Sequence, residues 1–258
     1  MTFNVVAKKD APDRSIQELW SEYCRLLIDT GRPGVKRLLN WMQSDNMPNG
    51  TLNFVNAPAS TRYHGAYPGG LVEHSLNVYT RLCWFVSQEN ILRDESEKLT
   101  SEESAQLLNS CAIVALLHDL CKAGFYTEEW RNQKVYSPNG SKEDPGGRFD
   151  WQVVRSYKVM DTHYFGHGAA SLEIAQRFLG VNGLTEEEKY AIRYHMGDFA
   201  NERETGDIYN RYPMATMLHM ADLAATYLDE RNCGSEIDDF WSHLNAFARP
   251  SKDKQTNT

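Results

Sequence analysis

The sequence predicts an all-α fold with a small β-hairpin insertion, and three observations support this prediction. Apolar residues recur at helical spacing along most of the chain, as they do in Ser15–Ile28. Helix-capping patterns such as Thr100-Ser101-Glu102-Glu103 stand at the start of such stretches. Only residues 125–165 lose the helical period and place aromatic and β-branched residues around Gly- and Pro-rich turn motifs. These features together indicate a helical bundle that is interrupted once by a pair of strands.

The helices can be placed in chain order from their apolar period and their end signals. We expect them over Ser15–Ile28, Val35–Met42, Leu71–Leu92, about 100–121, Gly168–Leu179, Thr185–His195, Pro213–Glu230 and Ser235–Phe247. Gly31-Arg32-Pro33-Gly34 separates the first two helices, and residues 45–70 are rich in Asn, Pro, Gly and Ser, which predicts a loop. Gly180 is suited to end its helix, and Pro213 is suited to a first turn.

Length and charge limit the organisation and the partners of the chain. Its 258 residues suit one large domain with additions at both ends. We expect a core domain over residues 61–232, with the hairpin insertion at 125–165. N-terminal helices and a loop over residues 1–60 are expected to pack on this domain. A C-terminal helix and tail are expected over residues 233–258. The formal net charge is −8, and phosphate backbones are bound by clustered Lys and Arg, so we expect no stable binding of long nucleic acid.

Cysteine usage and hydropathy indicate a cytoplasmic protein. The five cysteines are scattered, odd in number and without a Cys-x-x-Cys pair, and the chain shows no signal peptide, which predicts reduced thiols. No apolar run approaches the roughly 18 residues needed to span a bilayer, so we expect no membrane segment. The sequence carries no signal for or against an assembly of identical chains, and a homo-oligomer stays open.

The strongest local signal is the dipeptide His118-Asp119, which follows the apolar run Ala112–Leu117. Burying an aspartate at the end of such a run costs several kcal/mol unless a cation or hydrogen-bond donors satisfy it. A metal ion would do so. A histidine near the helix dipole and an aspartate that caps local groups explain the dipeptide alone equally well.

Four further residues turn this dipeptide into a candidate metal site. His74 and His167 lie at predicted helix starts, His195 ends a helix, and Asp222 lies within an apolar helix. Each histidine taken singly is more often a satisfied or solvated side chain. Taken together, imidazole nitrogens and carboxylate oxygens suit one or two divalent ions such as Mn, Fe, Co, Ni, Zn or Mg.

The order of these residues resembles the extended H…HD…H…H…D pattern of the HD superfamily of metal-dependent phosphohydrolases. The stretch Leu116-Leu117-His118-Asp119-Leu120-Cys121-Lys122 resembles the HD-plus-lysine signature, and residues 63–74 resemble the segment before the first ligand in HD domains of the 3′→5′ exoribonuclease type. The resemblance covers residues 60–230 or so and implies an HD-domain helical bundle. It also implies one metal at His74, His118, Asp119 and Asp222, and a second at His167 and His195, with Asp119 bridging.

This resemblance implies a metal-dependent phosphoric-ester hydrolase that acts on a small nucleotide, a nucleoside phosphate or a cyclic or short oligonucleotide, through a metal-activated water. One alternative is a 3′→5′ exonuclease-like phosphodiesterase, although residues 1–60 do not read as an added nucleic-acid-binding barrel. A second alternative is a mixed-valent di-iron oxygenase, because some HD proteins with the same four-His, two-Asp set are oxygenases of this kind. A third is a non-catalytic nucleotide-binding module, against which the intact ligand set argues.

The remaining site candidates rest on weaker signals. Asp119 and Lys122 are the expected catalytic residues, with Lys122 contacting phosphate, and a solvated lysine at a helix end is its competing explanation. Tyr63 and His64 are expected to line the substrate pocket, although ordinary loop packing explains them almost as well. Arg81 lies on the helix face of His74 and is a candidate phosphate contact, with a surface salt bridge as an equal rival.

For His219 and for the aromatic residues of the insertion, a structural role explains the sequence better than a functional one. His219 shares a helix face with Asp222, and we favour a packed core histidine over a residue that supports the metal site. The aromatic residues of the insertion are Trp130, Tyr136, Trp151 and Tyr157. They are candidates for a lid that stacks a base, but we favour a small core of the hairpin itself.

Overall fold

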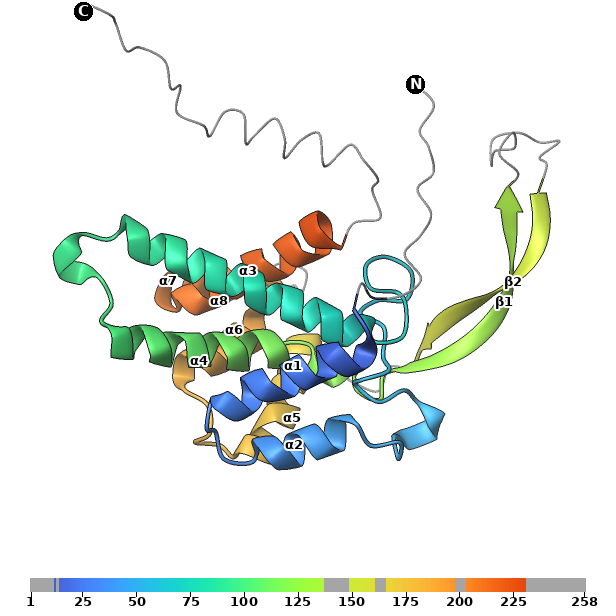
Figure 1. Ribbon diagram of the computed structural model, residues 1–258, viewed down its shortest axis with the longest axis horizontal. Coiled ribbons are helices and arrows are strands. Elements are labelled where there is room, and N and C mark those ends of the chain that lie inside the picture. The colour runs from blue at the N-terminus through green and yellow to red at the C-terminus, as the bar shows by residue number, and fades with distance from the viewer. Residues whose placement is uncertain (1–11, 13, 137–148, 161–165, 198–202, 231–258) are drawn as a thin grey trace, which may run out of the picture.

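The protein is a bundle of helices with one projecting β-hairpin (Figure 1). The computed structural model describes residues 12, 14–136, 149–160, 166–197 and 203–230. Its elements are α1 (Ile16–Asp29), α2 (Val35–Met42), η1 (Pro48–Gly50), α3 (Gly70–Leu92), η2 (Glu95–Glu97), α4 (Ser101–Leu117), η3 (Leu120–Lys122), β1 (Tyr126–Tyr136), β2 (Phe149–Val159), α5 (His167–Leu179), α6 (Glu186–Tyr194), α7 (Thr205–Arg211), α8 (Pro213–Ala224) and the π-helical turn η5 (Ala225–Asp229). This confirms the mostly helical fold with a small hairpin, while the helix expected over Ser235–Phe247 lies outside the described residues.

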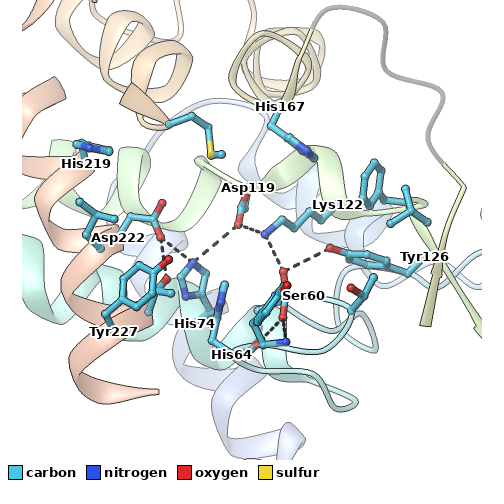
Figure 2. A pocket seen from close by; sticks show the side chains of 18 residues that line it. Ser60, His64, His74, Asp119, Lys122, Tyr126, His167, His219, Asp222 and Tyr227 are labelled. Carbon is cyan, nitrogen blue, oxygen red and sulfur yellow. Dashed lines mark hydrogen bonds and ion pairs between the residues drawn. The ribbon is translucent and has the colours of Figure 1, made fainter. Parts of the chain in front are cut away.

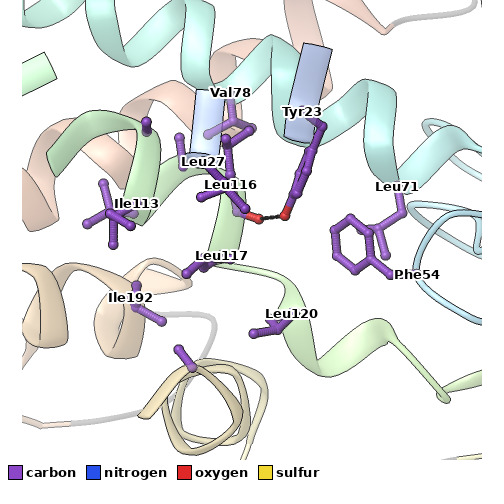
Figure 3. Packing of buried hydrophobic residues seen from close by; sticks show 14 of the residues in the cluster. Tyr23, Leu27, Phe54, Leu71, Val78, Ile113, Leu116, Leu117, Leu120 and Ile192 are labelled. Carbon is purple, nitrogen blue, oxygen red and sulfur yellow. Dashed lines mark hydrogen bonds between the residues drawn. The ribbon is translucent and has the colours of Figure 1, made fainter. Parts of the chain in front are cut away.

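The core is one continuous cluster of buried side chains to which the N-terminal helices also contribute. Helix α3 packs against α4 and α8, and α6 packs against α5 and α8. Leu71, Leu116 and Ile192 are fully buried where these helices meet (Figure 3). Burying such a side chain contributes about 1.5–3 kcal/mol, so this cluster holds the ends of α3, α4 and α6 in fixed positions.

Two side chains tie the N-terminal region to the helices that carry the candidate ligands. The Tyr23 hydroxyl donates a hydrogen bond to the Leu116 carbonyl oxygen, just before the end of α4 (Figure 3). Arg32 donates to the Glu188 carboxylate at 2.6 Å, and Glu188 at the start of α6 is only 1% exposed. A buried carboxylate needs such a partner, so the loop after α1 helps to fix α6.

Side-chain capping explains where α1, α4 and α6 begin. Ser15, Thr100 and Thr185 each cap a helix through a reciprocal capping box with a glutamate three residues later, which confirms the expected starts. Proline stands in the first turn of α8, and Gly180 ends α5 with φ at 85°, both as expected. The short helix α7 was not predicted from the sequence.

Two helices end earlier than their sequence period suggested. Helix α4 ends at Leu117 instead of about residue 121, because Asp119 adopts φ −105° and ψ 22° and breaks the helical path before η3. Helix α8 ends at Ala224 instead of Glu230, and the wider π-helical turn η5 follows. After these two helix ends, the carboxylates of Asp119 and Glu230 both lie close to the ring of His74.

The hairpin is confirmed as an antiparallel pair of two 11-residue strands. Its register pairs Tyr126 with Val159 at the base, Trp130 with Arg155 in the middle and Tyr136 with Phe149 at the far end. Residues 137–148 and 161–165, which the insertion was also expected to include, lie outside the described residues.

Helix α4 has one property that the sequence analysis did not anticipate. The segment Ser101–Lys122 is long and apolar enough to cross a membrane by length and composition alone, and 61% of its most apolar window is buried inside the protein. Its C-terminal half, from Cys111 onward, belongs to the core cluster. Packing of this kind is that of a central core helix.

Replacing Gly168 by alanine is expected to destabilise the protein. A Cβ atom at this position would lie 1.9 Å from the Arg193 carbonyl oxygen, so α5 and α6 could not keep their close approach. Strain of this kind costs about 1–3 kcal/mol of unfolding free energy, measured by urea denaturation. Gly206→Ala in α7 is the control, because nothing lies within 4 Å of the added atom. Equal stability of the two variants would contradict the observed packing of α5 on α6.

Candidate metal centre

Five of the six side chains expected as metal ligands converge in the bundle. His74 comes from the first turns of α3, His118 and Asp119 from the end of α4, His195 from the end of α6, and Asp222 from α8. The three histidines and Asp119 are buried, and Asp222 is partly buried. Figure 2 shows Asp119 facing His74 and Asp222 beside His74, at the wall of a cavity.

The rings of His118 and His195 are held in the same way. The Nδ1 atom of His118 lies 2.7 Å from the Ala115 carbonyl oxygen, and Nδ1 of His195 lies 2.7 Å from the Ile192 carbonyl oxygen. A carbonyl oxygen can only accept, so each Nδ1 carries the proton and each Nε2 presents a lone pair. Both Nε2 atoms are buried and have no hydrogen-bond partner among the described residues.

These unpartnered nitrogens point to a metal ion. A buried acceptor without a partner costs about 1–3 kcal/mol, so two of them in one place need an explanation. Metal-ligating histidines commonly donate the other ring N–H to a carbonyl or carboxylate, which fixes the ring and the tautomer. The arrangement of His118 and His195 therefore fits the requirements of metal ligands.

The separations between the candidate ligand atoms also fit an ion. Nε2 of His118 lies 3.4 Å from Asp119 Oδ2, and Nε2 of His195 lies 3.8 Å from Asp119 Oδ1. These distances are long for hydrogen bonds. They are close to the edge of about 3.4 Å that metal–ligand bonds of about 2.1 Å give in a tetrahedron.

Two overlapping groups of potential ligands share His118. One consists of His74, His118 and Asp222, and the other of His118, Asp119 and His195, with the ligand atoms of each group within 4.8 Å of one another. The two oxygens of Asp119 face different histidines, because Oδ2 is nearer His118 and Oδ1 is nearer His195. Because His118 has one free ring nitrogen, which can bind only one ion, the two groups together mark a position for a metal ion.

Asp119 is held as an anion by a neighbouring lysine. The Lys122 ammonium donates to Asp119 Oδ2 at 2.6 Å and to the Ala59 carbonyl oxygen at 2.7 Å. Burial alone would raise the pKa of Asp119, but the charge of the Lys122 ammonium holds that pKa well below its usual range. Asp119 is therefore ionised and ready to bind a cation at neutral pH.

His74 lies between two carboxylates, one of which the sequence analysis missed. Its Nδ1 donates to Glu230 Oε1 at 3.0 Å, and its Nε2 lies 3.2 Å from Asp222 Oδ1. Burial lowers the pKa of His74, but Glu230 and Asp222 outweigh it and raise the pKa to about 10. Without a metal, the His74 ring therefore carries a proton on both nitrogens at neutral pH. A metal bound at Nε2 would displace the proton there, while the Nδ1 proton would stay in the hydrogen bond to Glu230.

Two other histidines of the site are neutral at pH 7. Burial lowers the pKa of His195 to about 4. Burial and the nearby His74 lower the pKa of His64 to about 4 as well. His64 forms a third potential ligand group with His74 and Glu230. Glu230 contacts Nδ1 of His74, however, whereas Asp222 contacts Nε2.

A cavity of about 620 Å³ opens beside these residues. Among the described residues its lining consists of Ala59, Ser60, Thr61, Tyr63, His64, His74, Asp119, Lys122, Phe125, Tyr126, Val159, His167, Met196, His219, Asp222, Leu223, Thr226 and Tyr227. The volume lies within the usual range for small-molecule sites. Tyr63, His64 and Lys122, which were predicted to contact the substrate, lie in the wall of this cavity.

His167 and Arg81 lie apart from the ligand groups. His167 lines the cavity, but its Nδ1 lies 3.4 Å from Cys121 Sγ and it joins none of the potential ligand groups found among the described residues. Arg81 forms a two-pronged ion pair with Asp229 and is absent from the described lining, so the competing salt-bridge explanation applies to it.

His219 contacts the backbone of His195. Its Nδ1 donates to the His195 carbonyl oxygen at 2.6 Å, which fixes the end of α6. The side chain is partly buried and also lines the cavity, so it supports the site as well as the packing.

Comparison of the chain with models of known families, with curated proteins and with solved structures gives no match. The functional interpretation therefore depends on the residues of the site.

Proposed function

We propose that the protein is a metal-dependent phosphoric-ester hydrolase of the HD type that acts on a small nucleotide. The observation that carries the proposal is the pair of buried, unpartnered Nε2 atoms of His118 and His195 beside the ionised Asp119. One divalent cation would satisfy both lone pairs and bind the carboxylate as well. The cavity beside them has the size of a small-molecule site.

The donor set fits a divalent ion of borderline hardness. Imidazole nitrogens combined with carboxylate oxygens, and no thiolate in the groups, suit Mn, Fe, Co, Ni or Zn, and Mg where oxygens dominate. When bound, the ion supplies an acidified water and neutralises charge on phosphoryl oxygens. His74, His118, Asp119, His195 and Asp222 are the residues that would hold it.

Lys122 gives the site a fixed positive charge at the cavity wall. An ammonium group has three N–H donors, and two of them are directed at Asp119 and at the Ala59 carbonyl oxygen. The third donor has no partner among the residues that the structure describes, and we expect it to bind a phosphoryl oxygen of the substrate. Lys122 thus orients Asp119 and binds phosphate at the same time. Tyr63 and His64 form the adjacent wall, where they contact the rest of the substrate.

The test is a metal-dependent assay of a substrate panel. Purified protein is analysed for bound metals, stripped with a chelator and reloaded with each divalent ion in turn. We expect release of phosphate or of a nucleotide from at least one nucleoside phosphate, cyclic nucleotide or short oligonucleotide, most simply with Mn²⁺, and loss of this activity in the stripped protein.

Parallel measurements separate the competing reaction classes. Iron-dependent oxygen uptake with an organophosphonate or a polyol, without hydrolysis of any phosphoric ester, would replace the proposal by an oxygenase. Tight nucleotide binding without turnover under any metal would replace it by a non-catalytic binding module.

A further inference from the structure

One face of the hairpin is rich in aromatic side chains. In an antiparallel pair, residues directly opposite each other point to the same side, and the register therefore sorts β1 and β2 into two faces. The face that we call the aromatic face comprises Tyr126, Glu128, Trp130, Asn132, Lys134, Tyr136, Phe149, Trp151, Val153, Arg155, Tyr157 and Val159. The opposite face is mainly polar and comprises Thr127, Glu129, Arg131, Gln133, Val135, Asp150, Gln152, Val154, Ser156 and Lys158.

The aromatic face is not a small core of the hairpin, which corrects the interpretation favoured from the sequence. Trp130 is 63% exposed, Trp151 61% and Val153 65%, whereas Tyr126 and Tyr157 at the base are buried. The hairpin projects from the helical body (Figure 1), and a two-stranded ribbon gains little from exposing large apolar side chains. Exposed apolar surface of this kind marks an interaction site.

Two cations lie over the aromatic rings. The Lys134 ammonium lies 4.1 Å from the centre of the Phe149 ring and 5.5 Å from that of Trp151. The Arg155 guanidinium lies 5.8 Å from the centre of the Trp130 ring. Exposed aromatic rings interleaved with Lys and Arg form the surface on which bases stack while the cations meet phosphates.

The aromatic face leads into the cavity. Tyr126 and Val159, the first pair of the ladder, both line the cavity beside Asp119 and Lys122. Figure 2 shows the side chain of Tyr126, the first residue of β1, next to Lys122. An 11-residue strand spans roughly 35 Å, so the face extends over several nucleotides beyond the site.

We propose that the aromatic face binds the single-stranded part of an oligonucleotide whose terminal phosphodiester lies in the cavity. This inference rests on the proposed function and specifies its substrate class. The continuity of the face with the cavity and the interleaved cations favour a nucleic-acid strand over a second copy of the chain, because charged residues are depleted in the centres of protein interfaces. Stacking on a few rings agrees with a short strand, and no stable grip on long nucleic acid is required.

The test compares ligands of graded length on two matched variants. Binding is followed by isothermal titration calorimetry with a chelator present, so that no hydrolysis occurs, using a mononucleotide and single-stranded oligonucleotides of increasing length. The double variant Trp130→Ala/Trp151→Ala loses the two exposed rings. Trp84→Ala, a 52% exposed tryptophan on α3, is the control for loss of an exposed ring. Arg155→Ala is compared with Arg131→Ala on the opposite face.

The wild-type protein is expected to bind longer strands more tightly than the mononucleotide. The double variant is expected to lose this gain, by roughly fivefold to 100-fold for each base that stacks, and to bind the mononucleotide as before. Arg155→Ala weakens oligonucleotide binding, and Trp84→Ala and Arg131→Ala do not.

Three results would overturn the inference. They are affinity that does not depend on strand length, equal effects of Arg155→Ala and Arg131→Ala, and a wild-type dimer that the double variant converts to a monomer by light scattering. The proposed function fails separately, through lack of hydrolysis with metal present, while length-dependent binding under chelation would still stand.

Discussion

The variant Asp119→Asn is expected to lose its metal ions and its hydrolytic activity. Asp119 is the only carboxylate whose oxygens face both His118 and His195 among the described residues. An amide in its place has one neutral acceptor oxygen and two donors, which repel a cation. Loss of a residue that merely supports a ligand already costs about 10–100-fold in metal affinity or activity, so we expect a loss greater than about 100-fold here. Metal analysis by mass spectrometry and the hydrolysis assay measure it.

Two controls keep this result interpretable. Asp29→Asn removes a carboxylate that is 60% exposed and pairs with Arg25 alone within the described part of the chain, so the activity of this variant is expected to equal that of the wild type. Circular dichroism establishes whether Asp119→Asn is folded, and His195→Gln provides a second ligand variant if it is not. Full metal content in both ligand variants would show that these residues do not hold the ion.

Glu230→Ala is expected to weaken metal binding, although Glu230 contacts the proposed ligand His74 and not the metal. Glu230 accepts the Nδ1–H bond of His74 at 3.0 Å and is also bonded by the Asn77 amide. A carboxylate in this position fixes the ring and makes the opposite nitrogen a better ligand. Its loss is expected to lower the affinity for the metal by about 10–100-fold, measured by competition with a chelating dye.

A graded series separates positioning of His74 from general stability. Glu230→Gln keeps an acceptor for the Nδ1–H bond and is expected to bind metal with an affinity between those of Glu230→Ala and the wild type. Asp229→Asn breaks the neighbouring ion pair with Arg81 but leaves His74 untouched, so its metal affinity is expected to be unchanged. Equal metal affinity in Glu230→Ala and the wild type would exclude the positioning role.

Most of the fold could be predicted because its signals are local. Ser15, Thr100 and Thr185 mark helix starts through side chains that reach only three residues along the chain. The change of period after Phe125 marked the hairpin in the same way. The predicted ends of the helices were less accurate than their starts. Asp119, for example, departs from helical backbone angles where its side chain joins the candidate site, and that contact forms only in the folded protein.

The candidate site could be predicted only in part. An acidic or imidazole side chain on an apolar helix is a visible anomaly, which is how His118, Asp119 and Asp222 were predicted. Glu230 gave no such signal, because it follows an exposed Asp229 and comes next to His74 only through the π-helical turn η5. The pairing of Arg81 with Asp229 and the exposure of Trp130 likewise depend on tertiary positions that no short pattern encodes.

Anomalous diffraction from crystals of the protein loaded with Mn²⁺ or Zn²⁺ tests the metal centre most directly. The account predicts an anomalous peak within about 2.3 Å of the Nε2 atoms of His118 and His195 or of His74, and of an Asp119 oxygen. A fully loaded protein whose anomalous peaks all lie elsewhere, with those Nε2 atoms facing only protein or water, would contradict it.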